Sequence, residues 1–556
     1  MEAYILFSFI KKLLHLLLSK SHSIITENYL YNRQPLFIFI NYNFILSHCL
    51  KLVKYLCYFR IMPKPKAIII GAGIAGIASA IRLAVKGYQV DVFEANSQPG
   101  GKLGEIKMNG FRFDAGPSLF TMPQYVDELF KLAKKNPEDY FKYIKLKEIC
   151  RYFYEDGLRL NASSDLDKFA EEIAEKTNST ATEVQRYLKK SETIYEVTHR
   201  VFLERSLHKV KSYLHWDTLK SIFRFGPIDA FRTQAKANQS FFKDERITQL
   251  FNRYATYNGS DPYQAPATLN VIPHFEYHFG AFIPKNGMYG IVNALVKLAE
   301  ELGIRFHYNQ KVEEILYGNI GKPKIEGVKV NDKTYKADIV VSNLDIWFTY
   351  KNLLKGIAEP KKLLTQERSS SALIFYWGMD GQYSDLGLHN IFFAKDYQKE
   401  FNTIWKNKTI CNDPTVYINI SAKHIRNDAP ANAENWFVMI NVPANNGQNW
   451  DQLIKEARTN LIKKISRILN RNIEQDIICE QILDPRAIES KTGSYQGALY
   501  GNSSNNQFSA FLRHSNFSSK VKDLYFCGGS VHPGGGIPLA LLSAKIIDDD
   551  ITAVVQ

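Results

Sequence analysis

Ala67-Ile-Ile-Ile70, followed at once by Gly71-Ala72-Gly73-Ile74-Ala75-Gly76, is the stretch of sequence that decides the fold of this chain. The apolar, β-branched run is typical of a buried parallel strand. In the sequence that follows, the first glycine permits a tight turn, the second lets the backbone approach a pyrophosphate, and the third lets a helix pack closely on the strand. The stretch therefore predicts a strand, a turn and a helix that bind a dinucleotide.

The next residues complete this predicted nucleotide-binding unit. Residues 77–86 have a helix-forming composition, and Gly87 stands where a glycine often ends a helix. Residues 88–93 alternate like a second strand and lead to Glu94, at about the 20-residue spacing where an acid meets the ribose hydroxyls. The phosphates are expected at the helix N-terminus, and an acid disfavours NADP. The candidate cofactor residues are Gly71, Gly73, Ile74, Ala75, Gly76 and Glu94.

A second glycine-rich region lies just beyond, with Pro99-Gly100-Gly101-Lys102 and then Phe111-Arg-Phe-Asp-Ala-Gly116-Pro117-Ser118. A glycine pair shortly after the ribose acid is a mark of FAD proteins over NAD proteins. In both places the alternative is an ordinary turn or loop. We take Gly101, Lys102, Gly116 and Pro117 as candidate contacts to FAD.

The other half of the predicted site lies near the end of the chain. Residues 523–530 predict a strand that ends in glycines, and Val531-His-Pro-Gly-Gly-Gly-Ile-Pro-Leu539 leads into a predicted helix at 540–547. The three glycines would let backbone lie close to a flat ligand, and Pro538 suits the first turn of a helix. The helix N-terminus would stabilise negative charge on a reduced flavin. The candidates here are Gly529, Ser530, Gly536, Ile537, Pro538 and Leu539.

Two reactive side chains lie in this terminal region. His532 is interpreted as a hydrogen-bonding turn residue, with a catalytic base as the alternative. Cys527 is interpreted as a buried strand residue and not as a redox thiol.

Together these motifs resemble the carotenoid desaturase family of FAD-dependent oxidoreductases, which includes the bacterial phytoene desaturases. The resemblance covers residues 62–556 and includes Gly280-Ala-Phe-Ile-Pro-Lys-Asn-Gly-Met288, Ala337-Asp-Ile-Val-Val-Ser-Asn343 and His389-Asn-Ile-Phe-Phe393. Asn286 stands where the family usually has Gly. Within the family, Thr256-Tyr-Asn-Gly-Ser-Asp-Pro262 and the wording of residues 531–545 are most similar to the 1-hydroxycarotenoid 3,4-desaturases.

The resemblance implies an α/β fold with a discontinuous Rossmann-like FAD-binding domain of the GR2/amine-oxidase type and an inserted α+β substrate domain. The FAD-binding domain is expected from residues 62–150, 283–345 and 490–556, and a strand near Val312 would lend backbone groups to the adenine. The substrate domain is expected from the mainly helical 151–282, where 165–190 is a candidate lid, and from 346–489. Apolar runs at 372–378 and 436–442 would either floor an apolar tunnel or form plain core.

The resemblance also implies a reaction, the FAD-dependent desaturation of a hydrophobic carotenoid in carotenoid biosynthesis. The nearest likeness predicts a 1-hydroxycarotenoid 3,4-desaturase, with a phytoene desaturase or another carotenoid desaturase or oxygenase as the alternative. A non-catalytic prenyl-binding protein of the same fold is a distant alternative, because such binders lose the cofactor glycines that stand here. Quinone or oxygen would accept the electrons. No catalytic side chain is assigned, because a conjugated substrate stabilises its own cation and needs chiefly alignment and a dry tunnel.

The amino-acid composition limits which partners, metal sites and cellular locations are expected for this chain. The net charge of +14 suits an anionic surface, but no nucleic-acid-binding motif accompanies it, so nucleic acid is excluded as a partner. The six cysteines are scattered, which argues against a metal site or a disulfide framework.

A polyene is insoluble in water, so a cytoplasmic protein with peripheral membrane contact is expected. The aromatic, basic segment 213–232 is either an interfacial helix or a bundle helix.

Residues 1–61 differ from the rest of the chain. They hold no Gly and no Asp, and their apolar run is interrupted by Lys11 and Lys12, short of the ~20 residues that a spanning helix needs. We expect Met62 to be the true start and the preceding segment to be non-native upstream sequence or disordered, with a membrane anchor as the alternative.

Overall fold

The structure is a computed structural model, and it describes residues 64–209, 228–318, 321–506 and 513–554. Lys64–Val555 form one compact unit. The upstream segment 1–61 lies outside the described residues, and so does most of the aromatic, basic segment 213–232.

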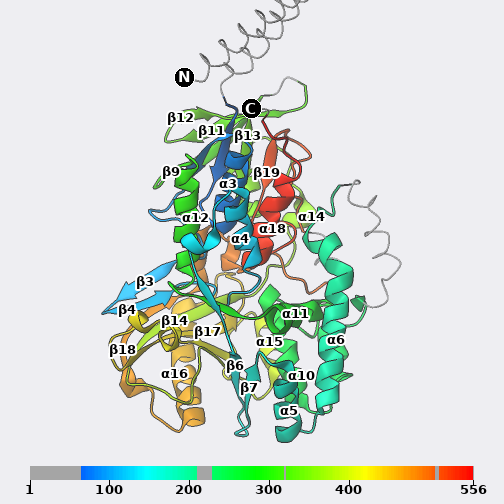
Figure 1. Cartoon of the computed structure of the whole chain (residues 1–556), viewed down its shortest axis with the longest axis vertical. Coiled ribbons are helices and arrows are strands. Elements are labelled where there is room, and N and C mark those ends of the chain that lie inside the picture. The colour runs from blue at the N-terminus through cyan, green and yellow to red at the C-terminus, as the bar shows by residue number, and fades with distance from the viewer. Residues whose placement is uncertain (1–63, 210–227, 319–320, 507–512, 555–556) are drawn as a thin grey trace, which may run out of the picture. The chain divides into compact units, whose positions relative to one another are not determined.

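The glycine motif follows the first strand of a five-stranded parallel sheet, whose spatial order is β19-β13-β1-β2-β9. Its strands are β1 (Lys66–Ile70), β2 (Gln89–Phe93), β9 (Arg305–His307), β13 (Ile339–Ser342) and β19 (Leu524–Phe526). The neighbours β1, β13 and β19 come from the beginning, the middle and the end of the described chain. The sheet is therefore assembled from segments that lie far apart in the sequence (Figure 1).

Helices cover one face of this sheet and pack on one another: α3 (Ile74–Val85), α4 (Gln124–Leu132), α12 (Tyr289–Glu301) and α18 (Ile537–Asp548). Small side chains make the close packing possible, since α3 begins Ile-Ala-Gly-Ile-Ala-Ser-Ala and is buried along most of its length. Both α3 and α18 begin three residues earlier than the sequence predicts, because the glycine-rich turns before them run directly into helical backbone.

A smaller antiparallel sheet covers the other face. Its strands are β10 (Val312–Gly318), β11 (Lys324–Val330) and β12 (Lys333–Lys336). Its Ile315 and Val328 share a core with Ile68 and Phe93 of the parallel sheet. Strand β1 is thus hidden on both faces from Ala67 to Ile70, which explains why these residues are all apolar and do not alternate.

A seven-stranded mixed sheet forms the second large element, in the order β18-β14-β17-β16-β15-β6-β7. Only the β15–β6 pair is parallel. Its strands are β6 (Glu148–Phe153), β7 (Arg159–Ser163), β14 (Ser371–Asp380), β15 (His389–Phe392), β16 (Val416–Asn419), β17 (Ala433–Val442) and β18 (Ile477–Leu483).

The two faces of this sheet have different roles. On one face Trp377, Trp436 and Ile440 pack against Leu461 of helix α16 (Trp450–Leu469). The alternate residues on the other face include Ile374 and line a large cavity. The runs at 372–378 and 436–442 therefore form plain core on one side and floor a cavity on the other.

Helices make up much of the chain between β7 (Arg159–Ser163) and β8 (Phe282–Pro284). They are α5 (Leu166–Lys176), α6 (Ala181–Thr198), α9 (Gln234–Gln239), α10 (Glu245–Asn252) and α11 (Ile272–His274). Their aromatic residues form a core with β6 and β7, as where the ring centroid of Tyr187 lies 4.2 Å from that of Phe251. The lid role of 165–190 and the predicted domain boundaries stay predictions.

The remaining elements are short. They are β3 (Glu105–Met108), β4 (Phe111–Asp114), β5 (Tyr143–Lys145), β8 (Phe282–Pro284), α13 (Ile346–Phe348), α14 (Lys361–Leu364), α15 (Tyr397–Trp405) and α17 (Pro485–Thr492). Within the described ranges, no helix has both the length and the apolar character needed to cross a membrane.

Candidate functional site

A cavity of about 1510 Å³ reaches from the glycine motif to the seven-stranded sheet. Pockets for drug-sized ligands measure roughly 300–1,000 Å³, so this one has room for a cofactor and a second ligand. Its lining contains every candidate cofactor residue except Gly76, namely Gly71, Gly73, Ile74, Ala75, Glu94, Gly101, Lys102, Gly116, Pro117, Val312, Gly529, Ser530, Gly536, Ile537, Pro538 and Leu539.

The turn between β1 and α3 has the tight geometry that the glycines predict. Gly71 has a φ of +93°, and its N–H donates to the carbonyl of Phe93 at 2.8 Å. A Cβ on Gly76 would lie 2.1 Å from the carbonyl oxygen of Gly71, so the third glycine lets the helix pack on the turn and does not face the cavity. Helix α3 has no side-chain cap and no acid in its first turn, so its N-terminal N–H groups suit an anion.

The carboxylate of Glu94 forms hydrogen bonds with both the glycine turn and the loop that follows β2. Its Oε2 accepts a hydrogen bond from the backbone N of Ala72 at 2.7 Å, and its Oε1 accepts from the backbone N of Asn96 at 2.9 Å. The carbonyl of Glu94 accepts from the N–H of Gln310 at 2.8 Å. This bond brings the start of β10, with Val312, beside the predicted ribose acid.

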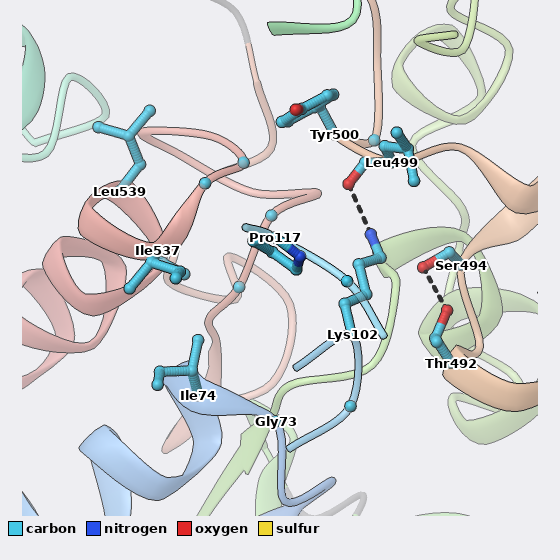
Figure 2. A pocket seen from close by; sticks show the side chains of 18 of the residues that line it. Gly73, Ile74, Lys102, Pro117, Thr492, Ser494, Leu499, Tyr500, Ile537 and Leu539 are labelled. Atoms are coloured by element: carbon cyan, nitrogen blue, oxygen red, sulfur yellow. Dashed lines mark hydrogen bonds between the residues drawn. The ribbon is translucent and has the colours of Figure 1, made fainter. Parts of the chain in front are cut away.

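Lys102 holds the second glycine-rich loop against the C-terminal part of the chain. Its Nζ donates to the carbonyl of Leu499 at 2.6 Å (Figure 2). It also donates to the carbonyl of Ala498 at 3.3 Å. Burial lowers the pKa of Lys102 to about 8, an effect that the carboxylate of Asp345 opposes. A Cβ on Gly116 would lie 1.9 Å from the carbonyl oxygen of Lys102, so this part of the loop admits only glycine.

The C-terminal glycines bring a second helix start to the same cavity. Gly536 has a φ of +104°, and a Cβ there would meet no atom of the described residues within 4 Å, so its backbone borders open space. Helix α18 begins at the next residue, with Pro538 in its first turn. Figure 2 shows Ile74 at the start of α3 and Ile537 and Leu539 at the start of α18 around one space. Two positive helix ends thus meet at this cavity.

The two reactive side chains of the terminal region are both constrained. The Nε2 of His532 lies 2.8 Å from the carbonyl of Arg205, and burial lowers the pKa of His532 to about 4. It is a neutral, hydrogen-bonded turn residue, as its sequence context suggests. Burial raises the pKa of the Cys527 thiol to about 12, so this thiol stays protonated.

Sequence reasoning assigned no role to Asn343, which joins the two halves of the site. Its backbone N donates to the carbonyl of Ile70 at 2.8 Å. A Cβ on Gly73 would lie 2.6 Å from its Nδ2, and one on Gly528 would lie 2.7 Å from its Oδ1. The residue stands within the quoted family motif at 337–343, and its position at the end of a buried strand is the signal that points to it.

Arg513 is a second residue that sequence reasoning missed. It lines the cavity and is 2 % exposed. Its Nη1 donates to the carbonyl of Tyr500 at 2.7 Å, and its Nη2 donates to Oδ1 of Asn258 at 3.0 Å. Burial lowers the pKa of Arg513 to about 10. No local pattern in the sequence marks it.

Taken together, the glycine turn, the ribose acid and the two helix starts around one cavity define a nucleotide-dependent oxidoreductase of the FAD class. The cradle fits FAD, because its backbone borders open space at Gly536, where a Cβ would meet no atom of the described residues and would project into the cavity.

Residues 74–368 match the family described as flavin containing amine oxidoreductase, and the chain belongs to this family. It is 49% identical over 484 residues to a 1-hydroxycarotenoid 3,4-desaturase of Flavobacterium sp. (strain P99-3), covering 87% of this chain and 98% of the relative. It is 33% identical over 508 residues to a 4,4'-diapolycopene oxygenase of Methylomonas sp, covering 88% and 99%. The predicted resemblance to carotenoid desaturases is therefore confirmed.

Solved structures agree on the fold. The cyclohexylamine oxidase of Brevibacterium oxydans IH-35A superposes with a TM-score of 0.55 at 15% identity, covering 88% of this chain and 99% of that one. The predicted α/β fold of the amine-oxidase type is confirmed. The chain is an FAD-dependent oxidoreductase, and the prenyl-binding alternative falls away.

Proposed function

We propose that this enzyme removes two hydrogens across the C3–C4 bond of a 1-hydroxylated carotenoid and so extends its conjugation. The identity with a 1-hydroxycarotenoid 3,4-desaturase over nearly the whole length of that relative supports the proposal. The structural observation that carries it is the single cavity that joins the glycine cradle to an apolar sheet face.

In this proposal the cofactor residues keep the roles that the motifs predict. The N-terminus of α3, with Gly73 and Ile74, receives the pyrophosphate, Glu94 receives the ribose, and Val312 borders the adenine. Gly116, Pro117, Gly529, Ser530 and the segment 536–539 border the flavin ring. The start of α18 favours negative charge there. When bound, FAD supplies the acceptor for the hydride that leaves the substrate.

The substrate half of the cavity supplies alignment and a dry environment. Its lining includes four apolar residues from three strands of the seven-stranded sheet: Ile374 of β14, Ile391 of β15, and Phe437 and Met439 of β17. An extended polyene on this face would lie against apolar side chains and exclude water from the reacting carbons.

We further propose that the enzyme works in the cytoplasm in peripheral contact with the membrane and passes electrons to quinone or oxygen. The water-insoluble substrate and the net charge of +14 support the membrane contact. Co-flotation with vesicles tests it: binding to anionic vesicles that weakens with salt is expected, and failure to bind any vesicle would contradict it.

The function is tested by expressing the chain in two hosts, one that accumulates phytoene and one that accumulates a 1-hydroxylated carotene. Pigments are separated by chromatography, and their molecular masses are measured by mass spectrometry. Loss of two hydrogens with a red-shifted spectrum in the second host alone supports the proposal. Coloured products from phytoene would make the chain an early-pathway desaturase, and gain of oxygen would make it an oxygenase.

A further inference from the structure

The lining of the substrate half of the cavity contains a cluster of buried polar side chains, which we call the polar wall. It consists of Ser118, Arg253, Tyr257, Glu276, His389 and Tyr417. A polyene has no hydrogen-bonding groups, so these polar side chains cannot form hydrogen bonds with the hydrocarbon part of a carotenoid.

An ion pair lies at the centre of the polar wall. The Nη2 of Arg253 lies 2.9 Å from Oε1 of Glu276, and the two side chains are only 4% and 3% exposed. Tyr257 accepts a hydrogen bond from Nη1 of Arg253 at 2.8 Å and donates one to Oε2 of Glu276 at 2.8 Å. Burying a charge pair has a desolvation cost that apolar side chains of the same volume avoid. A lining for a pure hydrocarbon would gain nothing from it.

His389, in the same wall, has a ring N–H whose position follows from the hydrogen bonds of its other nitrogen. Its Nδ1 lies 2.7 Å from the hydroxyl of Tyr417 and 3.2 Å from Nδ2 of Asn419. An amide nitrogen only donates, so Nδ1 accepts and the ring proton sits on Nε2. Burial lowers the pKa of His389 to about 3, which keeps the ring neutral.

Two donors of the polar wall have no acceptor among the described residues. In the part of the chain that the structure describes, neither Nε2 of His389 nor Nε of Arg253 has a hydrogen-bond partner, although both atoms are buried. Most buried polar groups in proteins are hydrogen-bonded, so an unpaired one calls for an explanation. Both residues line the cavity, and a small rotation of either side chain would let an oxygen atom of a ligand there supply the missing acceptor.

One end of the polar wall lies close to the turn that we place against the flavin ring, and the oxygen of a 1-hydroxylated carotenoid would have to lie near that ring. The hydroxyl of Tyr417 is 2.7 Å from Oγ of Ser118, which directly follows the Gly116-Pro117 turn that we place against the flavin ring. With C–C bonds of about 1.5 Å, an oxygen on C1 lies within about 5 Å of C4. The hydroxyl and the reacting bond must therefore sit side by side, as the polar wall and the flavin turn do.

We propose that the polar wall binds the oxygen at the hydroxylated end of the carotenoid, with the Nε2–H of His389 as the donor. This inference rests on the proposed function and adds to it the residues that select the substrate. Binding the oxygen there positions the C3–C4 bond at the flavin turn, so His389 is a positioning residue.

The test compares two ligands on the FAD-loaded full chain: a 1-hydroxylated carotene as substrate and the same carotene without the hydroxyl as competitive inhibitor. His389→Phe keeps a ring of similar size and removes both nitrogens. We expect kcat/KM for the hydroxylated substrate to fall about tenfold, or ~1.4 kcal/mol, mainly through KM, with an unchanged inhibition constant for the other carotene. His389→Gln returns a donor near Nε2 and restores most of the loss.

Met439→Leu is the matched control, because it changes an apolar side chain of the same cavity and should affect both ligands by the same factor. If His389→Phe fails to bind FAD, Asn419→Asp replaces it, because an acceptor in place of the Asn419 amide nitrogen lets Nδ1 carry the ring proton and removes the donor at Nε2. Equal losses for both ligands would overturn the polar-wall inference and leave the proposed function standing. A wild-type protein that converts no hydroxylated carotene would defeat the proposed function and this inference with it.

Discussion

Replacing Gly76 by alanine tests whether the close packing of α3 on the glycine turn maintains the cofactor site. The new Cβ would lie 2.1 Å from the carbonyl oxygen of Gly71, whereas a close C···O contact is about 3.3 Å. The turn would have to open by about 1.2 Å, the difference between these distances. Alanine gains about 1 kcal/mol of helix propensity over glycine, but overpacking costs about 1–3 kcal/mol. A displacement of this size in a binding turn also weakens ligand contacts.

We therefore expect Gly76→Ala to lower FAD affinity by about 10- to 100-fold, or ~1.4–2.8 kcal/mol, measured by titrating the flavin-free protein and following flavin fluorescence. Gly318→Ala at the far end of β10 is the control, because among the described residues its Cβ would meet the side chain of Glu326, whose flexible end, Oε1, is the nearest atom at 2.5 Å. Equal FAD affinity for the Gly76→Ala variant and the wild type would refute the reasoning.

Three further predictions follow from the same structure. Glu94→Gln should weaken FAD binding by about 3- to 10-fold, because a neutral amide is a poorer acceptor for the Ala72 N–H; an unchanged titration would remove Glu94 from the site. Glu276→Ala should lower the free energy of unfolding by about 3–5 kcal/mol, because it leaves Arg253 buried and uncompensated; urea denaturation measures this, and a loss below about 1 kcal/mol would contradict it. Burial raises the pKa of Glu400 from 4.5 to about 7, so the folded state binds the extra proton and stability falls as pH rises from about 4.5 to 7. Glu400→Gln should flatten that fall in denaturation at pH 5 and pH 8, and an unchanged slope would show that another group causes it.

Local patterns predicted the cofactor half of the site because each of its parts is written in one short stretch. The run from Ala67 to Gly76 contains a strand, a turn and the start of a helix, and the structure places them as β1 and α3. Even here the helix boundary was misplaced, because Gly76 looks like part of a turn but packs inside the helix.

The polar wall could not be predicted in the same way, because its residues come from separate segments. Arg253 and Glu276 lie among aromatic and apolar residues, and His389 and Tyr417 lie on neighbouring strands. Only the pairing of β15 with β16 brings the last two together, and strand order is not encoded in any single stretch. The sequence feature that could have pointed to the polar wall is the presence of two charged residues, Arg253 and Glu276, within segments rich in aromatic and apolar residues.

The order of strands in the parallel sheet has a consequence for the timing of folding during synthesis. Strand β13 pairs with β1 on one side and with β19 on the other, and helix α18 packs on α3. A growing chain therefore displays the finished glycine turn long before the ribosome has made Leu524–Phe526 and the helix that closes the site. Because these pairings join strands that lie far apart in the sequence, the nascent protein must wait with apolar surface exposed, and it becomes competent to retain a flavin only after α18 has been made.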